Sequence, residues 1–304
     1  MEVVSNKNIQ PEHHTKVQKS PSPWAIARKK FFKNKLAMIS LVFMVIITAL
    51  AVFAPYITTH DISRIDYMKM SLAPSAEHWL GTDTNGRDVF TRTIYGGRTS
   101  LLIGFSCTIL VVLIGTIIGA LAGYYGGTVD QALMRFTDFV LNFPLIVFVI
   151  VLNTIFVGKI SGVWTLILVV SALSWAGVAR LVRSKILAEK ENEYVLAAIS
   201  IGCSPAKVII KHLLPNVFST IIVQATLLMA VMIVFESSIS FIGFGVSADT
   251  PTWGNMLTEA RQSNVLQNQV WMWVPPGLAI TFTILAINFI GEGLKDALNP
   301  KSNR

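Results

Sequence analysis

Few residues of this chain have the types and spacing that catalysis requires. Its one Gly-Lys pair, Gly158-Lys159, is followed by Ile160, so a Gly-x-x-x-x-Gly-Lys-Ser/Thr loop for nucleotide phosphates is absent. Cys107 and Cys203 are too isolated for a disulfide framework or a zinc site. The histidines show no ligand-like spacing: His13, His14, His60, His78 and His212. The sequence therefore predicts no catalytic residue, no metal and no cofactor bound by this chain.

One carboxylate, Glu236, lies at the edge of a long apolar segment. It follows Asn216 by 20 residues, which is roughly 30 Å along a helix and places it near a membrane interface. An ionisable residue at such an edge is a functional candidate. The alternative, which we favour, is an interfacial carboxylate that accepts bonds from Ser237, Ser238 or backbone amides, because interfacial charges cost little compared with midplane charges.

A polar stretch at residues 81–101 combines a turn signal with opposite charges. Asn85-Gly86 predicts a turn, and Asp83 and Arg87 could pair across it. The alternative is a solvated charged loop, which is the usual outcome for such runs.

A second polar stretch, residues 193–216, predicts two helices joined by a sharp turn. Gly202 can end the first helix in a left-handed conformation, and Ser204 and Pro205 suit the start of the second. Four residues share one face of the first helix by their spacing: Tyr194, Ala197, Ala198 and Ile201. This face could dock a partner, or the hairpin could pack on the chain's own helices, since interfaces and cores resemble each other in composition.

Long uncharged stretches must position these residues. The chain is 53% hydrophobic and only 14% charged, whereas about a quarter of the residues of a soluble domain are charged. A membrane-spanning helix needs about 20 mostly apolar residues. Six stretches qualify: 36–59, 99–129, 139–158, 160–179, 213–235 and 262–291. We therefore expect an integral membrane protein with six spans.

Glycine and proline indicate how these spans pack and bend. Gly115, Gly119 and Gly123 form a stripe along which another helix can approach closely. Pro144 should kink the third span or mark its start. Pro275-Pro276 predicts the true start of the last helix.

The positive residues set the expected orientation. Eighteen of the 25 Lys and Arg residues precede the first span, follow the last, or lie in the second and fourth connections. The positive-inside rule places both termini and the 180–212 loop in the cytoplasm. Residues 1–22 read as a disordered cytoplasmic tail. Residues 23–35 predict a basic helix in the inner-leaflet interface, or alternatively a solvated basic linker.

Several of these segments also carry a family resemblance. Ala197-Ala198, Gly202 and the run at 212–216 resemble the Glu-Ala-Ala loop of permease subunits in ATP-binding-cassette importers, although Leu196 stands where that family has Glu. The Gly-Thr-Asp and Gly-Arg-Asp at 81–88 resemble the second permease of dipeptide, oligopeptide and nickel importers. So do the segments 236–245, 251–257 and 291–300. The resemblance covers residues 24–300.

The resemblance implies an all-α permease fold with six transmembrane helices and both termini cytoplasmic. Residues 36–98 would hold the first transmembrane helix and an outer segment, and 99–300 a five-helix permease core with an ATPase-docking loop at 189–215. The implied docking residues are Glu193, Tyr194, Ala197, Ala198, Gly202, Lys207, His212 and Pro215. The candidates for the outer segment or gate are Asp83, Arg87, Asp88, Glu236 and Trp253.

The resemblance further implies an importer for oligopeptides or dipeptides in the bacterial plasma membrane. The expected partners are a second homologous permease, two ATP-binding subunits that hold ATP and Mg, an extracytoplasmic peptide-binding protein and lipid, but no nucleic acid. The chain itself would not be an enzyme. The alternatives are a nickel-chelate importer, a membrane scaffold, or a stand-alone secondary transporter, for which the spans lack coupling carboxylates and repeats.

Overall fold

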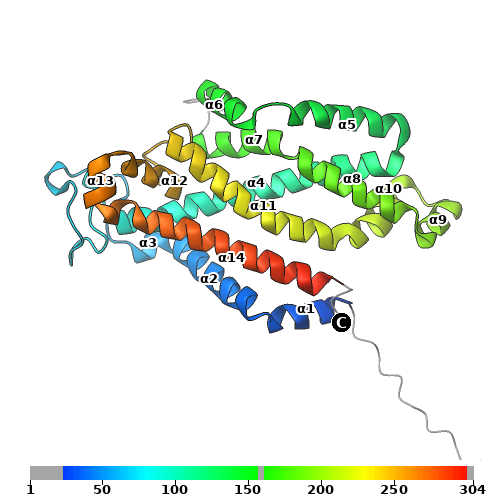
Figure 1. Cartoon of the computed structure of the whole chain (residues 1–304), viewed down its shortest axis with the longest axis horizontal. Coiled ribbons are helices and arrows are strands. Elements are labelled where there is room, and N and C mark those ends of the chain that lie inside the picture. Colours follow the sequence, from blue (N-terminus) through cyan, green and yellow to red (C-terminus); the bar gives the residue numbers. More distant parts are fainter. Residues whose placement is uncertain (1–22, 157–160, 300–304) are drawn as a thin grey trace, which may run out of the picture.

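The computed structural model describes residues 23–156 and 161–299, and these ranges fold into helices without a named strand. An isolated bridge joins Thr82 to Asp88. Long helices run side by side along one axis, with short helices and loops gathered at both ends (Figure 1). The prediction of an all-α protein is confirmed.

Four helical segments are each long and apolar enough to cross a membrane: α2 (Lys35–Val52), α4 (Val89–Tyr125), α10 with α11 (Pro205–Ile242), and α14 (Val274–Leu298). Two bent pairs also qualify. α5 (Gly127–Leu141) meets α6 (Leu145–Phe156) at 80°, and α7 (Gly162–Ser174) meets α8 (Ala176–Lys190) at 43°. The described residues therefore hold four spans, or up to six if each bent pair is one span.

The bends and helix starts follow proline chemistry in two places. The break between α5 and α6 contains Pro144, as predicted, because proline removes a backbone donor and disfavours a helical residue before it. α14 begins at Val274, directly before the proline pair. The span expected over 160–179 is bent in the described residues, since α7 and α8 share it. That stretch breaks at Trp175, whose ring is buried and stacks on Phe136.

α4 is the central helix, and its glycine stripe contacts α8. A Cβ atom at Gly115 would lie 2.6 Å from Val178 Cβ, and one at Gly123 would lie 2.8 Å from Ile186 Cγ2. Bare glycine backbone thus lets the two helices approach, as the stripe predicted. α11 and α7 also pack on α4, while α14 packs between α11 and α2.

The N-terminal basic segment is helical, as predicted. α1 (Pro23–Lys33) packs against α14, and Asn34 then separates it from α2 by accepting a bond from the Ala37 amide at 3.1 Å. The tail predicted at 1–22 lies outside the described residues.

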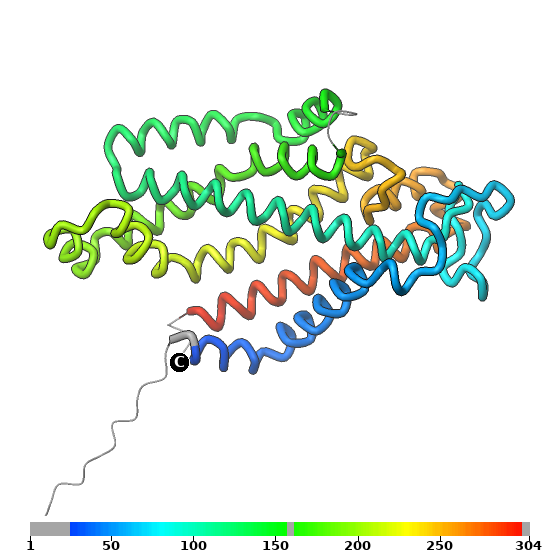
Figure 2. The backbone as a smooth tube through the Cα atoms, turned by 180° about the vertical axis from the view of Figure 1, so that it is seen from behind, coloured from blue at the N-terminus to red at the C-terminus, as the bar shows by residue number. Residues whose placement is uncertain are grey.

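The bundle has two distinct ends, and the ribbon and tube views place them opposite each other (Figures 1 and 2). The hairpin end holds α1, the end of α14, α9 (Glu193–Ser200), α10 (Pro205–Val208) and the π-turn η2 (Ile209–Leu213). The loop end holds α3 (Ala54–Ile57), η1 (Tyr67–Lys69), α12 (Trp253–Met256), η3 (Leu257–Arg261), α13 (Ser263–Asn268) and η4 (Val270–Met272).

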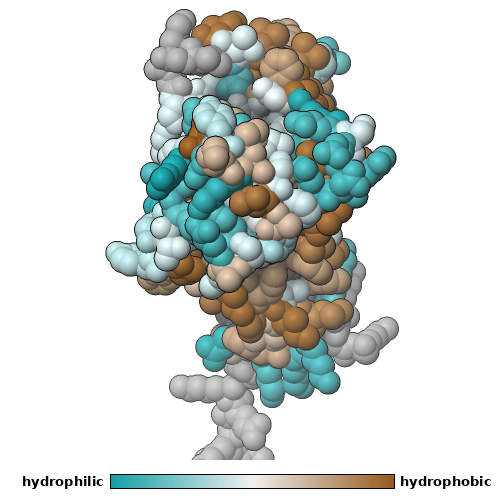
Figure 3. Space-filling model, turned by 90° about the vertical axis from the view of Figure 1, so that its left-hand side faces the viewer, coloured by the Kyte–Doolittle hydropathy of each residue, from teal (hydrophilic) through white to brown (hydrophobic). Residues whose placement is uncertain are grey.

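Polarity follows the same axis. Seen from the loop end, hydrophilic residues gather in the middle of the surface and hydrophobic residues lie above and below them (Figure 3). Along the flanks, large apolar side chains stay exposed, among them Ile39, Val45 and Ile117. Contiguous apolar surface of this kind marks contact with lipid or with partner helices.

Candidate functional site

The charged turn at the loop end is a structured ion pair. The Arg87 Nε donates to Asp83 Oδ2 at 2.7 Å, while Asp83 Oδ1 accepts from the backbone amides of Asn85 and Arg87, each at 2.9 Å. Gly86 turns the chain with a φ of +75°. The predicted pairing is confirmed, and the alternative of a solvated loop is wrong, because both side chains are buried.

Arg92 extends this pair to distant parts of the chain. Its Nη2 donates to the Ala248 carbonyl at 3.0 Å, its Nη1 to the Ile62 carbonyl at 3.2 Å, and its Nε lies 3.7 Å from Asp83 Oδ2. Sequence reasoning did not single out Arg92, and its one signal was its place in the same charged run. Together these contacts link the start of α4 to the segments that contain Ile62, Asp83 and Ala248.

A half-buried carboxylate adjoins this network. Thr84 Oγ1 donates to Glu259 Oε2 at 2.7 Å. Burial raises the pKa of Glu259, because desolvation penalises the charged form more than the nearby hydroxyl and arginines favour it. Glu259 was not among the predicted residues.

Asp88 acts first as a helix cap. Its Oδ1 accepts from the Thr91 amide at 2.7 Å, which satisfies an unpaired donor at the start of α4. Its Oδ2 accepts from His78 Nδ1 at 2.9 Å. The sequence analysis found no histidine cluster, but the structure brings His60 and His78 together around this aspartate.

Glu236 joins three helices from inside the bundle. Ser100 Oγ of α4 donates to Glu236 Oε2 at 2.9 Å, and Ser240 Oγ donates to Oε1 at 2.8 Å. Ser237 contributes a longer bond of 3.4 Å. Of the two serines that the interfacial interpretation named, Ser237 bonds to Glu236 and Ser238 does not, and Glu236 is 1% exposed. Ser238 instead donates to the Val234 carbonyl at 2.8 Å.

Trp253 anchors α12 against the same region of α4. Its backbone amide donates to Ser100 Oγ at 3.1 Å, and its indole Nε1 donates to the Thr93 carbonyl at 2.9 Å. A Cβ atom at Gly97 would lie 2.8 Å from Trp253 Cζ2, so glycine makes room for the ring. Glu236, Ser100 and Trp253 therefore form one buried hydrogen-bonded cluster between α11, α4 and α12. We call this cluster the buried lock.

The hairpin end carries the predicted turn. Gly202 ends α9 with a φ of +80°, and α10 begins at Pro205 after Ser204. The helix, turn and helix foreseen at 193–216 are confirmed. The π-turn η2, which the sequence analysis did not foresee, connects this hairpin to α11.

The faces of α9 differ from the expected ones. Val195 is buried in a cluster with Val182 and Ile186 of α8, and Ala198 is also buried. Ala198 therefore cannot belong to an exposed docking face, which corrects that assignment. Outward, Leu196 is 50% exposed and Ile201 is 81% exposed. One side of α9 therefore packs on the chain's own helices. The other side is exposed, as the docking of a partner would require.

The remaining hairpin candidates lie around this exposed side. Tyr194 donates to Glu189 and accepts from Asn216 Nδ2 at 2.8 Å. Burial and the bond to Glu189 raise the pKa of Tyr194 to about 12. His212 is half-buried, whereas four candidates are exposed: Glu193, Ala197, Lys207 and Pro215.

The arrangement of helices and polar clusters indicates the general class of protein, and comparison with known proteins then identifies the family. Apolar spans, buried polar clusters at one end and an exposed helical hairpin at the other are typical of a multi-pass membrane protein. The comparisons agree: residues 115–304 match the family described as the binding-protein-dependent transport system inner membrane component. The chain belongs to this family and is a multi-pass protein of the bacterial inner membrane.

A second family model and several individual relatives indicate which members of the family this chain is similar to. Residues 22–74 match the N-terminal transmembrane domain of oligopeptide transport permease C. A putative peptide permease protein of Brucella suis is 38% identical over 93% of both chains. The oligopeptide transport system permease protein OppC of Haemophilus influenzae is 38% identical over 92% of this chain and 89% of its own. The dipeptide transport system permease protein DppC of Bacillus subtilis is 39% identical over 91% and 86%.

Proposed function

We propose that this chain is one of two permease subunits of an ATP-driven importer for oligopeptides or dipeptides. The observation that carries the proposal is the exposed hairpin, which turns bulky apolar side chains away from the bundle on a chain of the permease family. Relatives named for oligopeptide and dipeptide transport support peptides as the substrate class.

The proposed topology has six spans, with each bent pair crossing once and both termini in the cytoplasm. Its support is the distribution of charge. α1 and the end of α14 lie at the hairpin end (Figure 1), where basic residues gather on α1, α8 and α10. Short connections rich in Lys and Arg remain on the cytoplasmic side.

Two ATP-binding subunits would dock on the hairpin. Leu196, Ile201 and Ile210 belong to the hairpin segment, and the described chain leaves all three exposed. ATP and Mg would be held by those subunits, so this chain would contribute no catalytic residue of its own.

The hairpin would work as a rigid lever. Its inner face, through Val195, shares an apolar cluster with α8, which in turn packs against the glycine stripe of α4. A displacement of the hairpin would therefore reach the central helix. ATP can drive the change only if it binds the outward-facing arrangement more tightly than the inward-facing one.

The translocation path would need a second, homologous permease. The apolar flanks leave surface for partner helices as well as lipid, while the polar loop end would receive an extracytoplasmic peptide-binding protein. The buried lock around Glu236 would keep the loop end rigid under that protein.

Purification of the tagged chain from its native membrane, followed by mass spectrometry, tests the proposal. We expect a second permease and one or two ATPases in the same complex, and loss of ATP-dependent uptake of a labelled peptide when this gene alone is deleted. A chain that purifies alone and moves solute in vesicles without ATP would overturn the proposal.

A further inference from the structure

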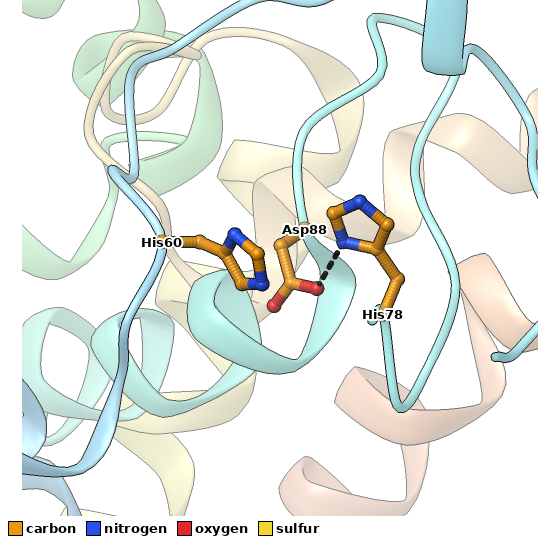
Figure 4. A group of neighbouring side chains, drawn as sticks. All are labelled: His60, His78 and Asp88. Atoms are coloured by element: carbon orange, nitrogen blue, oxygen red, sulfur yellow. Dashed lines mark hydrogen bonds and ion pairs between the residues drawn. The ribbon is translucent and has the colours of Figure 1, made fainter. Parts of the chain in front are cut away.

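Two histidines and an aspartate from separate segments meet at the loop end. His60 follows α3, His78 lies in the loop before Gly81, and Asp88 caps α4. One ring nitrogen from each histidine and one carboxylate oxygen lie within 4.8 Å of one another. Figure 4 shows the two imidazoles on either side of the Asp88 carboxylate.

The three side chains are held in place by their surroundings. His78 is 5% exposed, and its Nδ1 lies 2.9 Å from Asp88 Oδ2. The backbone amide of His78 donates to Ser75 Oγ at 3.1 Å. His60 Nε2 lies 3.1 Å from the Glu77 carbonyl, and the two imidazole rings are tilted by 30° with centroids 4.7 Å apart. Such positioning reduces the ordering that a ligand would require.

The group is not satisfied by protein contacts alone. His78 Nε2 is buried and has no hydrogen-bond partner among the described residues. The nearest charged oxygen is Glu77 Oε1 at 3.9 Å, beyond hydrogen-bonding distance. Buried polar nitrogens normally have a partner, so the unpaired Nε2 shows that protein contacts do not complete the surroundings of this ring.

The adjoining cavity has the charge that a cation prefers. It encloses about 300 Å³, and both histidines, four carboxylates and two basic side chains line it. The carboxylates belong to Asp61, Asp66, Glu77 and Asp88. Lys69 forms an ion pair with Glu77 at this cavity.

We propose that His60, His78 and Asp88 bind a divalent transition-metal cation such as Zn²⁺, with Glu77 as the nearest further carboxylate. Imidazole nitrogens with carboxylate oxygens are a donor set that suits zinc, at about 2.0–2.1 Å from the ion. Tetrahedral ligand atoms then lie about 3.3 Å apart, so the donors must close by about 1.5 Å at most. His78 and Asp88 already meet that spacing.

The ion would join three segments that are separate in the sequence. It would tie the end of the first span to the loop of residues 71–81 and to the N-terminal cap of α4. This inference is independent of which solute the chain transports, because it depends only on side chains at the loop end.

The test is metal titration of the full-length chain, purified in detergent with a tag that contains no histidine and freed of metal with a chelator. His13→Ala and His14→Ala are combined as the background, since this adjacent pair could bind metal elsewhere. We expect one equivalent of Co²⁺ to bind, with visible absorption that lacks a thiolate band, and Zn²⁺ to displace it.

Matched variants of this background locate the ion. His60→Gln should weaken binding by about tenfold or more, as loss of a metal-site side chain does. Asp61→Asn is the control: it changes an exposed carboxylate in the same cavity and should leave affinity within about twofold, as expected away from the ligands. If His78→Gln fails to fold, His60→Gln still decides, because His60 is only half-buried.

Three results would overturn the proposal. One is binding well below one equivalent in the background protein. Another is equal affinity in His60→Gln and its parent. The third is a pH-dependent change at the histidines without any metal binding, which would assign the pair to proton sensing instead.

Discussion

At the scale of single residues, Glu236 is a buried carboxylate that accepts hydrogen bonds from serine hydroxyls. It collects hydroxyl donors from α4 and α11, and Ser100 links it onward to the backbone of Trp253. A buried acceptor with several donors stabilises the fold chiefly because its removal leaves those donors unpaired.

Glu236→Ala should therefore destabilise the protein by about 1–3 kcal/mol, since Ser100 and Ser240 lose their buried acceptor. Glu236→Gln keeps one carbonyl oxygen and should lose less. Thermal unfolding in lipid nanodiscs measures both, with Glu292→Ala on an exposed position of α14 as the control. Equal melting temperatures for Glu236→Ala and the parent would contradict the lock.

Gly202 offers a second test at the same scale. Gly202→Asp should abolish peptide uptake while membrane insertion stays intact, because it adds charge to the exposed side of the hairpin. Gly202→Asn is the matched neutral variant, since Asn and Asp enter the left-handed region with similar ease. A Cβ atom at Gly202 would meet nothing within 4 Å, so steric clash does not confuse the comparison.

Uptake by Gly202→Asn above that of Gly202→Asp would show that charge matters more than the turn. Normal uptake by Gly202→Asp would remove the docking assignment of the hairpin.

At the scale of elements, the contact between α4 and α8 depends on the absence of side chains. Gly115 faces Val178 Cβ so closely that any Cβ must push the helices apart. Gly177 lies on α8 itself, but a Cβ there would meet nothing within 4 Å. The chain thus supplies its own matched pair of glycines.

Gly115→Ala should destabilise the folded protein by about 1–3 kcal/mol through overpacking. Gly177→Ala should be neutral or slightly stabilising, because alanine favours helix more than glycine does. Yield of monodisperse protein and melting temperature report both effects. Equal losses in the two variants would mean that the close approach of α4 and α8 is unimportant.

At the scale of the whole molecule, the two native cysteines report on topology. Cys107 is buried between helices, whereas Cys203 is half-buried beside the turn of the hairpin. In the chain expressed without partner subunits, a membrane-impermeant maleimide should label Cys203 in inside-out vesicles and not in intact spheroplasts.

Ala76→Cys in a Cys203→Ser background provides the reverse control, since Ala76 is exposed at the loop end. It should react only from the outer side. Labelling of both positions from the same side would contradict six spans with cytoplasmic termini.

The sequence by itself determined those features of this protein that depend on a single residue or on a short stretch of chain. Six apolar stretches indicated membrane helices because a bilayer demands long uncharged segments. Pro144 marked a bend, and Gly202 with Pro205 marked the hairpin, because each restricts its own backbone. The pairing of Asp83 with Arg87 followed from a four-residue turn.

The tertiary structure decided what depends on residues distant in sequence. Glu236 and Ser100 are 136 positions apart, and Arg92 reaches a carbonyl 156 positions away. The burial of Ala198 and the meeting of His60 with His78 likewise depend on which helices and loops pack together. Sequence periodicity specifies a helix and its faces, but the choice of neighbour for each face is made only when the whole bundle packs.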